Sequence, residues 1–574
     1  MSRLDAKKPS LCTSEPLTKE AVSCVLSVFS EIVKSCYGPT GRFKQLHNGM
    51  GGYVRTTSQS SALLGGLCIT HPVLRLLTAS VQSHLSCFGD CGLFTAILCC
   101  SLLEKIRALN VPPCTSIKIS QHLLSLCVDY LSSEACGCRM PVDFGSSKIP
   151  LCLVRSVLTS KRACMLSRSE ADHISTLVLK AFVLTIIPQN TESSVAFGKC
   201  LYIPVKARRA MDSAVYPGLL IETPDLNLTA ELPVRTATSC AIKMALFSLS
   251  LSGDLSDTGE GAIFVHRRVC LEAEVIGRLL NLGRQMVDDG VSLVVCQKVI
   301  HPALKQYLKE KHVVAVERVG AAVMEPLQQM TGSQPMPSLQ FLSPACYGRL
   351  KDLRAESFAS KRFLHLIPDN PVVCSLVLCS RNETAWEELR LACQTAEHVL
   401  QLTVSNPWVL LGGGCTETHL SSYIRHKSCA VTCSTLENLC CSRPEFQLVA
   451  DAFCDSLESV SRCLEHDSGD VLTDTKWGHF WSVPPDVPSG SDWSDVVVQR
   501  CGCGLCDLQQ GLGWKILQHR SLPFPPQSCV SESSITSTDN PVLDCFAAKR
   551  NGLQVAVETA SLLLDLSYIV EDRD

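Results

Sequence analysis

Residues 87–98 read CFGDCGLFTAIL, and the interpretation of the whole chain starts from this stretch. A Gly89-Asp90 turn opens directly into an apolar run that continues to Leu103. The run predicts a buried helix, and Asp90 stands where that helix begins, beside backbone N–H groups that can hold an anion. Its carboxylate can hold the metal ion that accompanies such an anion. The same residues also fit a plain helix N-cap, so their role depends on what other segments bring to this turn.

Length and composition describe an apolar chain of several domains. At 574 residues the chain is too long for one core, and roughly two to four domains are expected. Hydrophobic residues make up 46% and charged residues 19%, and the net charge is −3. No strongly basic region stands out. The short basic cluster at 206–209 is interpreted as a solvated loop or face. Nucleic acid is therefore not expected as a principal ligand.

Targeting signals and cysteine usage indicate a cytosolic protein. The N-terminus has no apolar core that could act as a signal peptide. The most apolar windows, 93–103 and 174–187, are shorter than the roughly 18–20 residues that span a bilayer, so no membrane insertion is expected. In a reducing compartment the 34 cysteines are interpreted as small buried hydrophobes. Cys501, Cys503 and Cys506 contain one CxxC without a second pair at zinc-ribbon spacing, which favours thiols over structural zinc and leaves metal binding there open.

Helical and strand patterns occupy different parts of the chain. One-sided helical periodicity predicts helices at 17–35, 93–103, 119–131, 155–187, 382–402, 446–464 and 553–566. Strands are predicted at 201–205, 218–221, 241–251, 291–296, 313–316 and 373–379, with helices at 271–287 and 302–309. Residues 471–545 lose periodicity and predict long loops. The expected fold is a multidomain α/β protein in which both chain ends build a helical domain around an inserted α/β middle.

Three further glycine turns could approach phosphates. Gly38-Pro39-Thr40-Gly41 is followed by Lys44, and Gly412-Gly413-Gly414 follows an apolar run. Glycine lets a backbone approach a ligand closely, yet each turn alone also fits a plain turn or close helix packing. Gly198-Lys199 resembles the tail of a phosphate-binding loop but lacks the leading glycine and the following Ser or Thr. An ordinary strand with a turn is favoured there.

Taken in order, the motifs resemble those of the group II chaperonins, the archaeal and eukaryotic cytosolic folding machines of the TCP-1 type. The resemblance covers almost the whole chain and points to a divergent vertebrate chaperonin-like branch. The similar motifs are Ser35-x-x-Gly38-Pro39-x-Gly41-x-x-Lys44, His71-Pro72 followed by Gly89-Asp90, Val291-x-x-Val294-Val295-x-Gln297-Lys298, Gly412-Gly413-Gly414-x-x-Glu417, and Ala556-x-Glu558-x-Ala560.

This resemblance implies a fold of three domains. The equatorial domain would comprise residues 1–145 and 395–574, and the intermediate domain 146–195 and 369–394. The substrate-binding apical domain would comprise 196–368. The resemblance also implies an ATP site with Mg²⁺. Its nucleotide-binding residues would be Gly38, Pro39, Gly41, Lys44, Gly89, Asp90, Gly412, Gly413 and Gly414, with Gly198 and Lys199 as much weaker candidates.

The catalytic positions of this family are only partly retained. The family uses three aspartates in ATP hydrolysis, one for magnesium and two for the attacking water. Asp90 matches the first and is the one catalytic residue expected here, whereas Ser58 and Thr395 stand at the other two positions. Losing one such group typically costs on the order of 10²–10³ in rate, so efficient hydrolysis is not expected. Binding suffers less, because backbone amides carry much of it.

Three functions follow from the resemblance. The first is a chaperone that binds clients through its apical domain, with a degenerate ATP site. It would work with cytosolic chaperonin subunits in assembling the Bardet–Biedl coat complex during ciliogenesis. The second is an active ATP-hydrolysing folding chaperonin, and the third is a non-catalytic scaffold at the centrosome or basal body. The implied location is the cytosol with centrosome association, and in part the nucleus.

Overall fold

The computed structural model describes residues 11–12, 19–47, 54–187, 195–223, 241–253, 271–336, 342, 344–359, 361–464, 482–483, 515–516, 541–568 and 570–571. The chain folds into two compact units. Residues 1–175 and 383–574 form the terminal unit, which contains both chain ends, and residues 176–382 form the middle unit. The division into three domains stays a prediction, and its intermediate segments 146–195 and 369–394 each cross the boundary between the two units.

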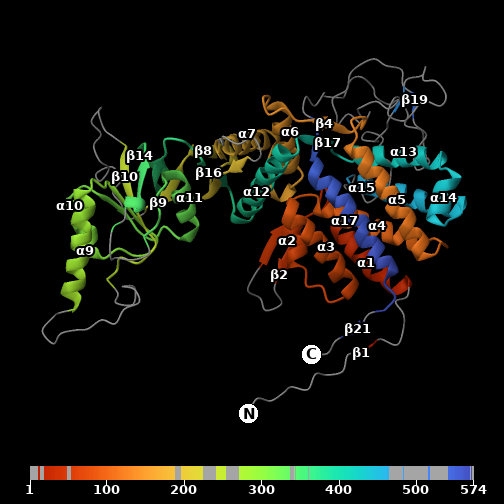
Figure 1. Ribbon diagram of the computed structural model, residues 1–574, viewed down its shortest axis with the longest axis horizontal. Helices are drawn as coiled ribbons and strands as arrows, with labels where there is room; N and C mark the ends of the chain where they lie inside the picture. Colours follow the sequence, from red (N-terminus) through yellow and green to blue (C-terminus); the bar gives the residue numbers. More distant parts are fainter. Residues whose placement is uncertain are drawn as a thin grey trace, which may run out of the picture. The chain divides into compact units, whose positions relative to one another are not determined.

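The terminal unit is mainly helical (Figure 1). Its helices are α1 (Lys19–Lys34), α2 (Ser60–Gly66), α3 (Pro72–Phe88), α4 (Gly92–Arg107), α5 (Pro113–Ser132), α6 (Lys148–Thr159), α12 (Glu383–Ser405), α13 (Cys415–Cys429), α14 (Cys433–Leu439), α15 (Arg443–Arg462) and α17 (Phe546–Asp565). Helix α7 (Arg168–Leu184) runs from this unit into the middle unit. Helix α4 is the centre of the bundle: α1, α3, α15 and α17 all contact it, and every residue from Gly92 to Leu103 is buried. Other helices surround α4, and this explains why its sequence is apolar on every face, since a helix that is hydrophobic all round is a buried one.

Short strands connect the helices of the terminal unit. The antiparallel sheet β20-β17-β4 joins Leu543–Cys545, Trp408–Leu411 and Arg139–Pro141. The remaining strands form antiparallel pairs, namely β2 (Lys44–His47) with β3 (Val54–Thr57), β1 (Leu11–Cys12) with β21 (Val570–Glu571), and β18 (Ser482–Val483) with β19 (Lys515–Ile516).

The middle unit is an α/β structure. In its four-stranded sheet β10 (Ile242–Phe247), β11 (Leu293–Cys296) and β12 (Val314–Val316) are parallel, and β13 (Tyr347–Leu350) is antiparallel to β10. The helices α9 (Leu271–Asp288), α10 (Pro302–Glu310) and α11 (Ala321–Thr331) belong to it. The other sheets are β14 (Asp352–Phe358), β15 (Lys361–Ile367) and β9 (Leu219–Glu222), and β7 (Lys199–Lys206), β16 (Val373–Ser380) and β8 (Ala214–Pro217), with the short pair β5 (Ile186–Ile187) and β6 (Ala196–Phe197).

Several predicted elements need correction. The helix predicted over 155–187 is broken: α6 ends at Thr159, α7 begins at Arg168, and the end of the segment is strand β5. The β-branched pair in β5 forms a ladder with Phe197, which a periodicity count within the segment does not detect. The predicted loop region 471–545 ends in strand β20, and the last helix begins at Phe546 rather than at 553. Most of that region lies outside the described residues.

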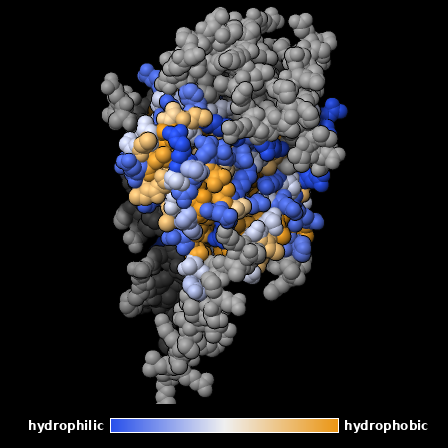
Figure 2. All heavy atoms as spheres, turned by 90° about the vertical axis from the view of Figure 1, so that its right-hand side faces the viewer, coloured by the Kyte–Doolittle hydropathy of each residue, from blue (hydrophilic) through white to orange (hydrophobic). Residues whose placement is uncertain are grey.

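The surface hydropathy and the helix lengths bear on membrane contact. Figure 2 shows a mostly hydrophilic face on which apolar residues gather in several patches. Among the described residues, no helix is both long and apolar enough to cross a membrane.

Candidate functional site

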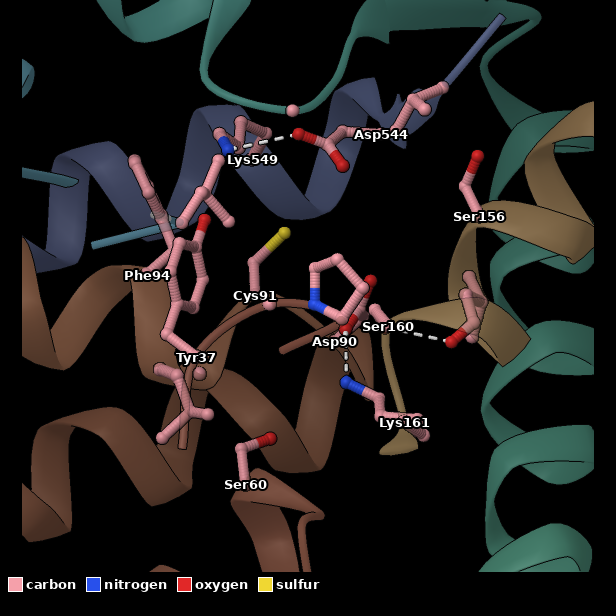
Figure 3. Close-up of a pocket in the computed structure, with 18 of the residues that line it drawn as sticks. Tyr37, Ser60, Asp90, Cys91, Phe94, Ser156, Ser160, Lys161, Asp544 and Lys549 are labelled. Carbon is pink, nitrogen blue, oxygen red and sulfur yellow. Dashed lines mark hydrogen bonds and ion pairs between the residues drawn. The ribbon is translucent and has the colours of Figure 1, made fainter. Parts of the chain in front are cut away.

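A cavity of about 120 Å³ lies within the terminal unit, and we call it the glycine-turn cavity (Figure 3). Parts of four segments line it, within 36–39, 90–94, 156–161 and 542–549. Four single residues complete the lining, namely Ser58, Ser60, Gly413 and Leu464. Segments from both ends of the sequence therefore meet at one place.

The turn between α3 and α4 is built by its backbone. Gly89 ends α3 in the left-handed region with φ +70°, and its N–H donates to the carbonyl of Leu85 at 2.8 Å. A Cβ at Gly89 would lie 3.1 Å from Cδ2 of His398, so both conformation and space favour glycine. Cys91, also left-handed with φ +62°, is the N-cap of α4 and makes no side-chain cap bond. The N-cap role considered for Asp90 is therefore wrong, because Asp90 precedes the cap and its carboxylate is directed elsewhere.

That carboxylate faces a lysine. Oδ1 of Asp90 lies 3.7 Å from Nζ of Lys161, and the two side chains are 20% and 11% exposed. The backbone carbonyl of Asp90 is bonded to Nε2 of His84 at 2.9 Å, which fixes the turn. Figure 3 shows Asp90 and Lys161 directed toward each other. Sequence reasoning missed Lys161, which follows the end of α6 and has no motif of its own.

A second, buried ion cluster forms another part of the wall. Lys549 of α17 pairs with Glu417 of α13, and its Nζ lies 3.0 Å from Oδ2 of Asp544. Burial alone lowers the pKa of Lys549, but the carboxylates of Asp544 and Glu417 outweigh it and hold that pKa well above its usual value. Nζ also lies 4.2 Å from the ring centroid of Phe94.

This cluster was missed as well. Its signal in the sequence was Asp544 between Leu543 and Cys545, a carboxylate inside an apolar run. Such a residue is buried only when it is paired, and Lys549 stands five residues later.

The first predicted phosphate loop lies only partly at the cavity. Gly38 and Pro39 line it, and Gly38 has φ +78°. Gly41 closes the turn, since its N–H donates to the Gly38 carbonyl at 3.1 Å, and a Cβ there would lie 2.4 Å from the Cys36 carbonyl. Gly41 and Lys44 are not among the lining residues. The side chain of Lys44, in β2, interacts with the Cys36 thiol instead.

The third glycine turn contributes Gly413 to the lining. Gly412 donates its N–H to the Val542 carbonyl at 2.9 Å, which ties the turn to the segment that leads into α17. Gly414, with φ +88°, is the N-cap of α13, and Glu417 in the first turn of that helix reaches Lys549. The glycines thus place the start of one helix beside the start of another.

Ser58 and Thr395, the two positions at which the resemblance predicts a lost catalytic aspartate, lie in different surroundings. Ser58 lines the cavity, but its hydroxyl donates to Oε2 of Glu388 at 3.2 Å and accepts from the N–H of Ala163 at 3.3 Å. Glu388 is 1% exposed and also accepts from the hydroxyl of Thr57 at 2.6 Å and from the N–H of Ser58 at 3.0 Å. Thr395 lies on α12 and is not a lining residue. Neither position offers a carboxylate to the cavity.

The remaining candidates lie away from the cavity. Gly198 and Lys199 belong to the middle unit. A Cβ on Gly198 would lie 1.6 Å from the Val372 carbonyl, and Lys199 pairs with Glu325. These contacts give both residues a structural role, and their weak nucleotide assignment stays an untested prediction. Cys501, Cys503 and Cys506 lie outside the described residues. Within the part of the chain that is described, no group of three metal-ligating side chains occurs.

The donor set fits a phosphate better than a whole nucleotide with its metal. Gly92, Leu93 and Phe94 of the first turn of α4 line the cavity, and N–H groups of a first helical turn suit an anion. Lys161 adds a positive charge. Mg²⁺ prefers carboxylate and phosphate oxygens, and of the predicted positions only Asp90 presents a carboxylate. The volume of about 120 Å³ is small beside the roughly 300–1,000 Å³ of pockets that enclose such ligands, so a whole nucleotide requires widening.

Comparisons with known proteins show the family of the chain. Residues 29–574 match the model of the TCP-1/cpn60 chaperonin family. The molecular chaperone MKKS of Homo sapiens is 57% identical, and that of Mus musculus 55%, each over the full length of both chains. Thermosome subunit alpha of Archaeoglobus fulgidus is 22% identical over 464 residues, 79% of this chain and 80% of its own. The group II chaperonin resemblance, and within it the likeness to the McKusick–Kaufman syndrome protein, is thus confirmed.

Proposed function

Because the chain belongs to the TCP-1/cpn60 chaperonin family, we propose that it is a molecular chaperone that holds client proteins and hydrolyses ATP poorly. The holding role is supported by full-length identity of 57% to relatives named molecular chaperone. The clients would bind to the middle unit, whose order in the chain corresponds to the predicted apical domain. A non-catalytic scaffold remains the runner-up, and it differs in that nucleotide would not alter client binding.

The main support for poor ATP hydrolysis comes from the hydrogen bonds of Ser58. Its hydroxyl donates its one proton to Glu388 and accepts from Ala163, and a serine hydroxyl is too weak a base to take a proton from water, so Ser58 does not replace an aspartate that positions the attacking water. Asp90 would hold magnesium together with the phosphates of the nucleotide. Lys161 and the first turn of α4 would bind the phosphates themselves. Asp544, the other carboxylate in the lining, is paired with Lys549, so Asp90 alone would serve magnesium, and such a site would bind nucleotide without positioning a nucleophile.

Single-turnover ATP hydrolysis by the purified full chain tests this proposal. We expect a rate at least about 10² below that of a thermosome subunit measured in parallel, because two positioning groups are missing. The same preparation should suppress aggregation of a heat-unfolded model protein without added ATP. A magnesium-dependent rate that matches the thermosome and disappears in Asp90→Ala would establish an active ATPase instead.

Partners and location belong to the same proposal. We infer cooperation with cytosolic chaperonin subunits in assembling the Bardet–Biedl coat complex, and residence in the cytosol and at the centrosome or basal body, with a nuclear fraction. Affinity capture from ciliated cells, with and without ATP, separates the alternatives. Clients released by ATP support a chaperone, whereas clients retained equally in both conditions support the scaffold.

A further inference from the structure

Two thiols meet in a turn that the proposed function does not use. Cys136-Gly137-Cys138 connects α5 to β4, and the Arg139 N–H donates to the Cys136 carbonyl at 3.4 Å, which closes the turn. The turn brings the two Sγ atoms to 3.4 Å from each other. This is hydrogen-bond distance for sulfur, so one thiol donates to the other. Cys136 is 4% exposed and Cys138 is fully buried.

The two thiols differ in acidity. Burial raises the pKa of many buried thiols among the described residues, including that of Cys127 on the preceding helix. The pKa of Cys136 is lowered instead, because the Cys138 thiol donates to its sulfur and Arg139 lies nearby. Burial and the partner sulfur raise the pKa of Cys138. An acidic thiol beside a second thiol is the arrangement in which one sulfur reacts and the other resolves the product.

We propose that Cys136 and Cys138 form an oxidisable dithiol that closes to a disulfide with a peroxide as the oxidant. The Cys136 thiolate attacks one oxygen of hydrogen peroxide, and the O–O bond breaks to give Cys136 sulfenic acid and hydroxide, which leaves as water after taking a proton. The Cys138 sulfur then attacks the Cys136 sulfur, the S–O bond breaks, and the hydroxyl leaves as water with the Cys138 proton. Two thiols and one peroxide thus yield one disulfide and two waters. A small-molecule thiol reverses the reaction by exchange.

The geometry allows closure with little movement. A disulfide needs an S–S distance of about 2.05 Å, so the two sulfurs must approach each other by roughly 1.4 Å in total. Gly137 between them has no side chain to obstruct the turn. Its N–H donates to the Tyr130 hydroxyl at 3.1 Å, which holds the turn against α5.

Closure would affect the third glycine turn. The Leu411 N–H donates to the Cys138 carbonyl at 3.0 Å, and the Thr416 hydroxyl donates to the Leu411 carbonyl at 2.7 Å. The Thr416 hydroxyl also lies close enough to the Cys138 thiol to counteract part of the rise in its pKa. Disulfide formation would draw Cys138 toward Cys136 and away from Thr416. Thr416 lies in sequence between Gly413 and Glu417. The dithiol is therefore a modification site joined to the cavity wall, although its chemistry does not depend on nucleotide binding.

Differential alkylation of the full chain tests the proposal. The reduced protein is treated with hydrogen peroxide, unfolded in iodoacetamide, reduced, labelled with a second reagent and digested with trypsin. Cleavage after Lys118 and Arg139 places Cys127, Cys136 and Cys138 in one peptide, so Cys127 is an internal control. We expect the second label on Cys136 and Cys138 together, about tenfold above Cys127, whose raised pKa disfavours the thiolate. Cys99 and Cys100, buried neighbours on α4, should behave like Cys127 because adjacent helical side chains diverge.

Variants distinguish pairing from general oxidation. In Cys136→Ser the second label should disappear from Cys138, and in Cys138→Ser Cys136 should stop at a sulfenic acid that a dimedone probe captures. Cys127→Ser should leave the Cys136–Cys138 disulfide unchanged. Amide exchange over residues 408–418 should change on oxidation of the wild type only. Equal labelling of Cys127 and Cys136, or a Cys136 that stays fully alkylated by iodoacetamide while exposed cysteines oxidise, overturns the proposal.

Discussion

Oδ1 of Asp90 and Nζ of Lys161 lie 3.7 Å apart on the wall of the glycine-turn cavity, so the carboxylate that we propose as the magnesium ligand is already paired with a cation. Magnesium must compete with that lysine for Asp90. We therefore expect Lys161→Met to raise the affinity of the nucleotide-free protein for Mg²⁺ roughly fivefold, equivalent to about 1 kcal/mol for a partly exposed pair. The same change should weaken inorganic phosphate binding. Titration calorimetry with each ion measures both effects.

Arg162→Met is the matched control for that experiment. Arg162 follows Lys161 directly, and its Nη1 donates to the Thr40 carbonyl at 3.3 Å rather than to Asp90. Its removal should leave magnesium affinity within the error of the titration. Equal magnesium affinity in Lys161→Met and in the wild type would show that the ion pair does not limit metal access.

Placing an aspartate at Ser58, where the family resemblance predicts one, should destabilise the protein for a structural reason. Ser58→Asp would place a carboxylate beside the buried carboxylate of Glu388, where the Ser58 hydroxyl now donates at 3.2 Å. Two like charges at that distance cannot both ionise cheaply, and we expect the free energy of unfolding to fall by about 2–4 kcal/mol. Urea unfolding measures the loss.

A double-mutant cycle identifies the cause. Ser58→Asp combined with Glu388→Gln should recover most of the lost stability, because the amide can donate to the new carboxylate. Ser58→Asn, which retains a donor for Glu388, should cost less than Ser58→Asp. A Ser58→Asp protein that is as stable as the wild type would show that Glu388 does not exclude a second charge.

The sequence predicted the glycine turns near the cavity but not the ion pairs in its wall. Gly38, Gly89 and Gly413 were predicted from the family motifs and because glycine lets a backbone approach a ligand; all three have positive φ, but only Gly38 and Gly413 line the cavity. Asp90 was predicted by the turn and the family motif together. The Lys161 and Lys549 pairs could not be predicted, since each partner comes from a distant segment and only the fold brings them together.

The secondary structure also divides into elements that the sequence predicted and elements that it did not. Long helices such as α1, α12 and α15 were predicted within a few residues, because their apolar periodicity is local. The hairpin β2–β3 and the strands β4 and β20 were not, since a strand of three or four residues is defined by its partner across the sheet. The hydrogen bonding of Ser58 could not be predicted either, because its partner Glu388 lies 330 positions away in sequence.

Lys549 is expected to be the cavity residue on which stability depends most. Lys549→Met would leave the buried carboxylate of Glu417 and the partly buried carboxylate of Asp544 without their cation, and we expect a loss of about 3–5 kcal/mol in urea unfolding. Lys199→Met, which breaks a largely exposed pair with Glu325, should cost no more than about 1 kcal/mol. If both substitutions cost the same, the buried cluster has no special role.

His419 should make the protein sensitive to acid. It is fully buried on α13, its Nε2 lies 2.8 Å from the Tyr130 hydroxyl, and burial lowers its pKa to about 3. The unfolded chain, with a histidine pKa of about 6.5, takes up a proton that the folded chain refuses as the pH falls. The stability due to neutral His419 is therefore complete above pH ~6.5 and is lost progressively toward pH ~3. Between pH 7 and 5.5 this residue alone should reduce the free energy of unfolding by about 1.3 kcal/mol.

The histidine contribution is measured by comparison with His419→Gln. Glutamine can still accept from the Tyr130 hydroxyl but does not titrate, so the variant should lose about 1.3 kcal/mol less than the wild type over the same pH interval. Other histidines titrate equally in both proteins and cancel in the difference. Urea unfolding at pH 7 and pH 5.5 gives the four values required. Identical pH dependence in the two proteins would mean that His419 accepts a proton in the folded state, which requires its ring to be reached by water.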